Sequence, residues 1–147
     1  MNRELHLIKS FNLEPGDRII IPKSFFGLVQ HHALYLGYNE FGEHLMCENV
    51  IGNGVILTRV DSFFQDIKSV TRIEKFNGNN LQRKLIVQKA LSRLGKPYSL
   101  INYNCESFCN DVQHNMIKSA QVTVGLVFGF VGIMIALLHT DYGKQNV

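Results

Sequence analysis

The sequence predicts an α+β domain with a small antiparallel sheet, followed by a C-terminal transmembrane helix. Three observations predict this arrangement. Short alternating or β-branched runs, separated by turn residues, fill the first half of the chain as far as residue 76. A helical period replaces them between residues 81 and 94. An uncharged, apolar run then covers residues 122–138, which is close to the length needed to cross a bilayer.

The size and composition of the chain fit one domain with one modest core, because 46% of its 147 residues are hydrophobic. The net charge of +3 comes from scattered Lys and Arg residues without the dense basic stripe of a nucleic-acid surface, so no nucleic-acid partner is predicted. An odd count of three cysteines, no CxxC pair and no secretory signal indicate free thiols in a reducing compartment. The histidines show no zinc spacing, so we expect neither a metal nor a cofactor.

The first half of the chain is predicted as a polar lead and about five strands. The lead ends in the turn signal Glu14-Pro15-Gly16-Asp17, and glycine-containing turns separate several of the strands that follow. A short helix is expected to start at Asp61. The predicted strands cover residues 18–22, 30–37, 44–49, 55–60 and 70–76.

Two helices are predicted in the second half of the domain. The first follows an apolar stripe and ends at Gly95-Lys-Pro97, since glycine followed by proline terminates helices. The second opens after a short loop, with Asn104 as its N-cap and Cys105 in its first turn. The stripe of the first helix consists of Leu85, Ile86, Ala90, Leu91 and Leu94.

The C-terminal apolar run divides the chain into three predicted parts. Residues 1–118 form the folded domain, 119–140 a single-pass membrane anchor, and 141–147 a short tail. Such an anchor inserts after synthesis, so we expect the domain to face the cytosol. The spacing Gly125-x-x-x-Gly129 permits close pairing of helices in lipid, and self-association through this helix is therefore a further expectation. The alternative to a membrane span is a helix buried in the protein core.

Cys105 is the first candidate for chemistry. Cysteine attacks carbonyl groups as the thiolate, and the partial positive charge at a helix N-terminus favours that anion. The alternative is an inert, buried cysteine. Cys109 lies one turn later and is expected to face the core, while Cys47 alternates with Glu48 on its strand.

A thiolate nucleophile needs a base, and His31 and His32 are the candidates within a predicted strand. Because they are adjacent, their side chains point to opposite faces. His31 shares its face with small or amphipathic neighbours, which favours it as the partner of the thiol, although either histidine can be structural.

A third polar group would orient the imidazole ring and stabilise its charged form. The strand from His44 to Asn49 offers Glu48 first, then His44 on the same face, with Asn49 on the other face. The alternative for Glu48 is an exposed carboxylate at a strand edge.

Two segments of the sequence resemble one known family. His31-His-Ala-Leu-Tyr-Leu-Gly37, followed downstream by Asn104-Cys-Glu-Ser-Phe108, is similar to the signature boxes of the lecithin–retinol acyltransferase family, of the H-Ras-like suppressor phospholipase and acyltransferase type. The resemblance covers residues 12–138, including the turn at Pro15-Gly-Asp17 and Ser119-x-Gln121-Val122 before the apolar segment. Ser107 departs from the family pattern, which commonly has histidine at that position.

The resemblance implies a circularly permuted papain-like domain of the NlpC type. It also implies Cys105 as nucleophile and His31 as base. The family's third polar residue is usually a histidine on the next strand, and the aligned position here is Glu48, with His44 as the alternative. The expected activity is cleavage of a glycerophospholipid ester through an acyl-cysteine intermediate, with transfer of the acyl group to water, an amine or an alcohol. Two alternatives are a papain-like peptidase or isopeptidase and a catalytically silent, membrane-bound interaction module.

Overall fold

The structure is a computed structural model that describes residues 3–23 and 29–144, with side chains described as far as residue 134 of the C-terminal helix. Parts of the predicted domain, anchor and tail, namely residues 1–2, 24–28 and 145–147 and the side chains of 135–144, lie outside the described residues. The described part confirms an α+β domain built on one five-stranded antiparallel sheet. Its strands are β1 (Arg18–Pro22), β2 (Gln30–Tyr38), β3 (His44–Val50), β4 (Gly54–Arg59) and β5 (Arg72–Glu74).

The strands are ordered β4-β3-β2-β1-β5 across the sheet. The first four strands pair with their neighbours in sequence, whereas β5 pairs with β1 at the far edge. β2 lies at the centre of the sheet, and seven of its nine residues are buried because both of its faces are covered. The strand that carries both candidate histidines is therefore the most enclosed element of the sheet.

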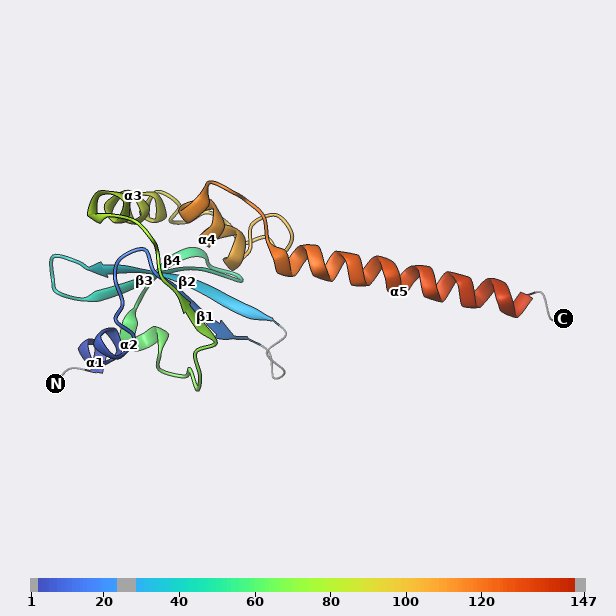
Figure 1. The fold of residues 1–147 in the computed structure, drawn as a ribbon, viewed down its shortest axis with the longest axis horizontal. Coiled ribbons are helices and arrows are strands. Elements are labelled where there is room, and N and C mark those ends of the chain that lie inside the picture. Colours follow the sequence, from blue (N-terminus) through green and yellow to red (C-terminus); the bar gives the residue numbers. More distant parts are fainter. Residues whose placement is uncertain (1–2, 24–28, 145–147) are drawn as a thin grey trace.

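Helices cover both faces of the sheet (Figure 1). α3 (Asn80–Leu91) and α4 (Cys105–His114) lie on one face, and α1 (Arg3–Ser10) and α2 (Val60–Phe63) lie on the other. Each face has its own apolar cluster. Leu34 packs with Phe108 under α3 and α4, whereas Ala33 packs with Phe63 on the side of α1 and α2.

Local contacts fix the start of α4. Asn104 is the N-cap, as predicted, and its side-chain oxygen accepts from the Ser107 backbone N–H at 2.9 Å. The buried Arg18 guanidinium of β1 donates to the Asn110 side chain at 2.6 Å and to the Glu106 carbonyl at 3.3 Å. These bonds hold the first turns of α4, including Cys105, against the sheet.

A close approach at Gly54 supports the segment that leads into α4. Gly54 has a φ of +73°, and a Cβ atom at this position would lie 2.5 Å from the Lys96 carbonyl oxygen. The same carbonyl accepts from the Val55 N–H at 3.0 Å. A side chain at position 54 would therefore push this segment away from the sheet.

Three elements differ from the sequence-based prediction. The polar lead contains α1, which a weak apolar pattern did not reveal. The predicted strand at 70–76 shortens to Arg72–Glu74. On α3, Ile86 is buried but Leu85 and Leu91 are exposed, so the predicted apolar stripe is only partly the packed face.

The C-terminal helix α5 (Ala120–Lys144) leaves the domain beside the start of α4 and extends away from it (Figure 1). The large apolar side chains that the structure describes from Val124 to Met134 of this helix are exposed. Within the part of the chain whose side chains are described, no helix meets the length and hydropathy needed to cross a membrane.

Candidate active site

The predicted site residues His31, Glu48 and Cys105 come together at the start of β2. His31 is the second residue of β2. Glu48 lies on the neighbouring strand β3, where it pairs with Ala33, two residues after His31. Cys105 is the first residue of α4. Its sulfur lies 3.7 Å from the carbonyl oxygen of Gln30, which is the first residue of β2. Three separate elements therefore meet around one imidazole ring.

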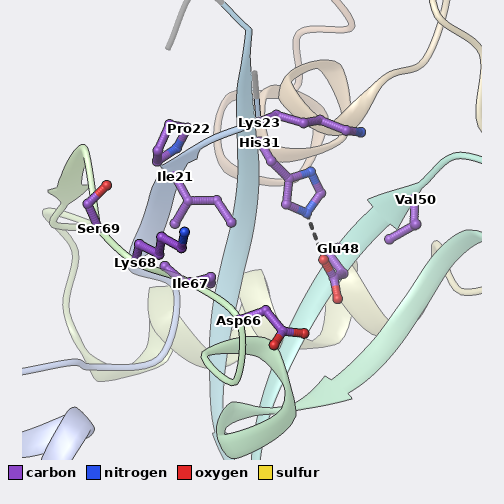
Figure 2. Close-up of a pocket in the computed structure, with 10 residues that line it drawn as sticks. All are labelled: Ile21, Pro22, Lys23, His31, Glu48, Val50, Asp66, Ile67, Lys68 and Ser69. Carbon is purple, nitrogen blue, oxygen red and sulfur yellow. Dashed lines mark hydrogen bonds and ion pairs between the residues drawn. The ribbon is translucent and has the colours of Figure 1, made fainter. Parts of the chain in front are cut away.

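The His31 ring faces Glu48 with one nitrogen. His31 Nε2 and Glu48 Oε2 are 2.6 Å apart, and both side chains are largely buried (Figure 2). The other carboxylate oxygen of Glu48 accepts from the Thr58 hydroxyl at 2.5 Å. Because Glu48 is only 8% exposed and fully engaged, it is not the exposed edge carboxylate that the sequence left as an alternative.

The second ring nitrogen of His31 does not contact Glu48. His31 Nδ1 is buried, and among the described residues it makes no well-aligned hydrogen bond. Cys105 and Glu48 are the ionisable groups that interact most strongly with the ring. The imidazole thus interacts with both the thiol and the carboxylate, and its contact with the carboxylate is through Nε2.

The charges of these groups support one another. Burial alone lowers the pKa of His31, but the Cys105 thiol and the Glu48 carboxylate outweigh burial and raise it to about 9. Burial alone raises the pKa of the Cys105 thiol, but the His31 ring lowers it below its usual value. The thiolate and the imidazolium therefore stabilise each other, and the Glu48 carboxylate also stabilises the positive ring.

His32 occupies the opposite face of β2, as its position next to His31 predicts. Burial and the nearby Arg18 guanidinium lower the pKa of His32 to about 4, so this ring is neutral at pH 7. Its Nε2 lies 3.4 Å from the Gln121 side-chain nitrogen. The side chain of His32 therefore belongs to a different polar cluster from that of His31.

His44, the alternative third residue, is not placed against His31. Its Nδ1 lies 2.6 Å from the Tyr35 hydroxyl, and its ring stacks on Tyr35. Asn49 points to the other face of β3 and donates to the Tyr103 carbonyl at 2.7 Å. Of the three polar residues on this strand, Glu48 is the one that contacts the imidazole of His31.

The other two cysteines lie in the core. Cys47 and Cys109 are fully buried, and burial raises the pKa of each thiol to about 12. Cys109 faces the apolar cluster under α3 and α4, as its position one turn after Cys105 predicts. Among the described cysteines, Cys105 therefore has the environment of a reactive thiol.

A pocket of about 570 Å³ opens beside His31 and Glu48 (Figure 2). Four apolar side chains contribute to its wall, and two lysines and two small polar side chains lie around it. Cys105 is not among the described residues that line it. Besides His31 and Glu48 the lining consists of Ile21, Pro22, Lys23, Val50, Asp66, Ile67, Lys68 and Ser69.

Sequence reasoning missed several residues of this region. Thr58, which donates to Glu48, is half-buried between the exposed residues Leu57 and Arg59 of β4, and it could have been found by pairing that strand with β3. Lys23 and the segment around Ile67 reach the pocket only through the path of the chain between elements, which no local pattern shows. Among the described residues, no three His, Cys, Asp or Glu side chains gather as a metal site.

Comparison with protein families identifies the family to which this chain is similar. The family described as lecithin retinol acyltransferase matches residues 11–118 of this chain. The matched range contains β1 to β5, α2, α3 and α4, and with them His31, Glu48 and Cys105. Neither the search of curated proteins nor that of solved structures found a match.

Proposed function

The chain belongs to the lecithin retinol acyltransferase family, whose members are typically cysteine-dependent acyltransferases and phospholipases, and from this premise we propose that it cleaves a glycerophospholipid ester through a thioester on Cys105. The observation that carries the proposal is the buried arrangement in which His31 contacts the Glu48 carboxylate and interacts with the Cys105 thiol. The order of the chain, with the histidine strand before the cysteine helix, is that of a circularly permuted papain-like domain of the NlpC type, and we propose that arrangement for this fold.

In the first half of the reaction, the Cys105 thiolate attacks the ester carbonyl carbon, and a tetrahedral oxyanion forms. The Cys105 backbone N–H lies in the first turn of α4, where no helical carbonyl is available to it, and it can donate to this oxyanion. The C–O bond then breaks, and the His31 imidazolium gives its proton to the leaving lysophospholipid oxygen. The products of this half are a lysophospholipid and an acyl group bound to Cys105 as a thioester.

In the second half, an acceptor replaces the cysteine. Water, an amine or an alcohol gives a proton to the now neutral His31 and attacks the thioester carbonyl. The Cys105 thiolate leaves, and the starting ion pair with the His31 imidazolium is restored. Throughout both halves Glu48 stays charged, so it holds the ring in place and stabilises the positive form.

The surroundings of the site suit a phospholipid. Ile21, Val50 and Ile67 give the pocket an apolar wall, while Lys23 and Lys68 supply positive charge for a phosphate group. Lys23 also interacts electrostatically with the Cys105 thiol and with Glu48. An ester that joins an acyl chain to an anionic headgroup matches this combination of apolar and basic side chains.

Product analysis tests this function. The full chain is incubated with vesicles of a phospholipid of defined acyl chains, and the lipids are separated and weighed by mass spectrometry. Without an added acceptor we expect equal amounts of lysophospholipid and free fatty acid, and with an added amine we expect the corresponding amide. Cleavage of peptides without release of lysophospholipid would assign the site to a peptidase and overturn the proposal.

The proposal includes attachment to a membrane through residues 119–140, with the domain of residues 1–118 facing the cytosol. Residues 122–138 carry no charge in the sequence, and the large side chains described between Val124 and Met134 are exposed to solvent in the isolated chain. Exposed apolar surface of this size is typical of a segment that meets lipid or another chain. Gly125 and Gly129 permit close packing of two such helices, so pairing with a second copy is part of the same proposal.

Charged substitutions in the helix test the attachment. Leu126→Lys combined with Phe130→Lys should release the full chain from vesicles in a flotation assay, because each central lysine costs about 2.5–3.5 kcal/mol of insertion free energy. Activity on vesicles should fall, while hydrolysis of a short-chain, soluble ester should remain. Leu81→Lys combined with Leu85→Lys, at two exposed positions of the α3 segment, is the matched control. Equal flotation of both double variants would contradict attachment through this helix.

A further inference from the structure

The first residues of α5 are fastened to the start of β2, beside the nucleophile. The side chain of Gln121 reaches both backbone groups of Gln30. Its Oε1 accepts from the Gln30 N–H at 2.8 Å, and its Nε2 lies 3.3 Å from the Gln30 carbonyl oxygen. One amide thus replaces a neighbouring strand at this end of β2.

The same carbonyl is the acceptor of the candidate nucleophile. The Cys105 sulfur lies 3.7 Å from the Gln30 oxygen, so the thiol and the Gln121 amide share one acceptor. A protonated thiol can donate to that oxygen, whereas a thiolate is repelled by it. A second donor that hydrogen-bonds to the Gln30 carbonyl therefore weakens the hydrogen bond by which this oxygen stabilises the protonated thiol.

A second set of bonds fixes the same helix start to α4. Glu106, the residue after Cys105, accepts from the Ser119 hydroxyl at 2.6 Å and from the Gln121 backbone N–H at 3.2 Å. The Gln121 side-chain nitrogen lies 3.4 Å from the same carboxylate. Glu106 and Ser119 are both buried, so these contacts are held away from water. Gln121 is thereby set between the first turn of α4 and the end of β2.

We propose that Gln121 is a positioning residue that holds the Gln30 carbonyl and so favours the reactive, deprotonated form of Cys105. This inference rests on the proposed function and adds a residue outside the matched range of 11–118 to the machinery around the thiol. It also means that the start of α5 contributes to the chemistry, in addition to the attachment proposed for the rest of that helix.

A test of this proposal must separate the effect of Gln121 on the Cys105 thiol from the effects of the titratable groups around that thiol. The other titratable groups that interact with Cys105 are His31 from β2, Lys23 after β1, Tyr98 before α4 and Cys109 on α4 itself. None of these is changed by a substitution at position 121. A role of Gln121 that is limited to fastening α5 predicts no change in the pH at which Cys105 becomes reactive.

Alkylation of Cys105 in the full chain, in detergent micelles, measures this pH directly. The rate of modification by iodoacetamide is followed between pH 5 and pH 10, and the modified peptide is identified by mass. Gln121→Met keeps the length of the side chain and removes its hydrogen bonds. We expect the midpoint of the pH profile to rise and the rate at pH 7 to fall about five-fold, the size expected for one hydrogen bond.

Gln113→Met is the matched control, because the Gln113 side chain also donates to a backbone carbonyl, that of Gly16, at 2.9 Å and far from the thiol. Its profile should match the parent profile. Gln121→Asn retains the amide but is too short to reach both backbone groups, and it should shift the midpoint in the same direction by less. This second variant decides the question if Gln121→Met does not fold.

The outcomes separate this inference from the proposed function. A reactive parent Cys105 whose profile is unchanged in the folded Gln121 variants overturns the positioning role and leaves the proposed function standing. A parent Cys105 that titrates as an ordinary thiol, with a midpoint of about 8.5, overturns the proposed function and this inference with it. A raised midpoint in the Gln121 variants, absent in Gln113→Met, supports the inference.

Discussion

The two faces of β2 place the same side chain in opposite states. His31 faces Glu48 and the Cys105 thiol, and these groups raise its pKa to about 9. His32, the next residue, faces the other layer, where burial and Arg18 lower its pKa to about 4. Both rings are buried, so burial alone does not decide their charge. The difference shows that the partners supplied by the neighbouring elements make one histidine a base and leave the other neutral.

The largest expected effect comes from removing the Cys105 thiol, which interacts with His31. Cys105→Ala should lower the rate of phospholipid cleavage by at least about 10³-fold, because no other group can form the covalent intermediate. Cys109→Ala, one turn later but in the apolar cluster, should retain most of the activity at some cost in stability. Cleavage rates and thermal unfolding are measured on both variants. Substantial turnover by Cys105→Ala would contradict the assignment of the nucleophile.

The two histidines provide the next comparison. His31→Gln should lower kcat by about 10²-fold or more, since the proton acceptor and donor is lost. His32→Gln should have a much smaller effect, because its ring lies on the opposite face of β2, next to the Gln121 side chain. Both variants are assayed on the same vesicles. An inactive His32→Gln with an active His31→Gln would mean that the wrong face of β2 has been assigned to the chemistry.

The sequence predicted these opposite faces because alternation along a strand is a local property. For the same reason it predicted the N-cap at Asn104 and the position of Cys105 in the first turn of α4. It did not predict the pairing of β5 with β1, because strands distant in sequence find each other through the packing of the whole sheet. α1 was missed because its residues are mostly polar, and the packing of Leu7 and Ile8 on the apolar cluster depends on residues far away in the sequence.

The candidate site shows the same division between local and long-range information. The family pattern selected His31 and placed Glu48 at the third position, while strand alternation left Glu48 and His44 equivalent. The structure separates them, because the register of β2 against β3 brings Glu48 to His31 and leaves His44 with Tyr35. The family resemblance includes Gln121, but its contact with Gln30 spans 91 positions and uses backbone groups, so the resemblance does not indicate what the side chain binds.

A smaller effect is expected from neutralising Glu48, the carboxylate that contacts His31 on one face of β2. Glu48→Gln keeps the size of the side chain and removes its charge, so kcat should fall by about ten-fold, which corresponds to about 1.4 kcal/mol. The parent should lose activity as pH rises through about 9, where His31 loses the proton it gives to the leaving group. In Glu48→Gln this alkaline limit should move down by about one pH unit, because an opposite charge next to the ring is gone.

Two further variants sharpen the assignment of Glu48. Glu48→His should recover part of the activity, since the related enzymes commonly have histidine at the third position. His44→Ala should behave like the parent in the same pH series, because its ring is held by Tyr35. A damaging His44→Ala together with silent Glu48 variants would show that the third residue has been misassigned on the correct strand.

The smallest effects concern stability as a function of pH. The raised pKa of His31 contributes stability that is complete below pH 6.5 and is lost as pH rises through about 9. The lowered pKa of His32 acts in the opposite window, because protonation of the unfolded chain removes stability as pH falls from 6.5 towards about 4. Denaturant midpoints of His31→Gln should therefore depend less on pH on the alkaline side, and those of His32→Gln less on the acid side. An unchanged acid limb in His32→Gln would contradict the neutral state of that ring.

The covalent intermediate gives the most direct test of the central claim, that Cys105, His31 and Glu48 together transfer an acyl group. The full chain is mixed with a phospholipid of a single acyl chain, quenched in acid after short times, and weighed intact and as peptides. We expect a mass increase of one acyl group on the peptide that contains Cys105, removed by neutral hydroxylamine as thioesters are. The adduct should accumulate more slowly in His31→Gln and be absent in Cys105→Ala. Release of fatty acid with no adduct on Cys105 at any time, or an adduct that persists in Cys105→Ala, would contradict the account.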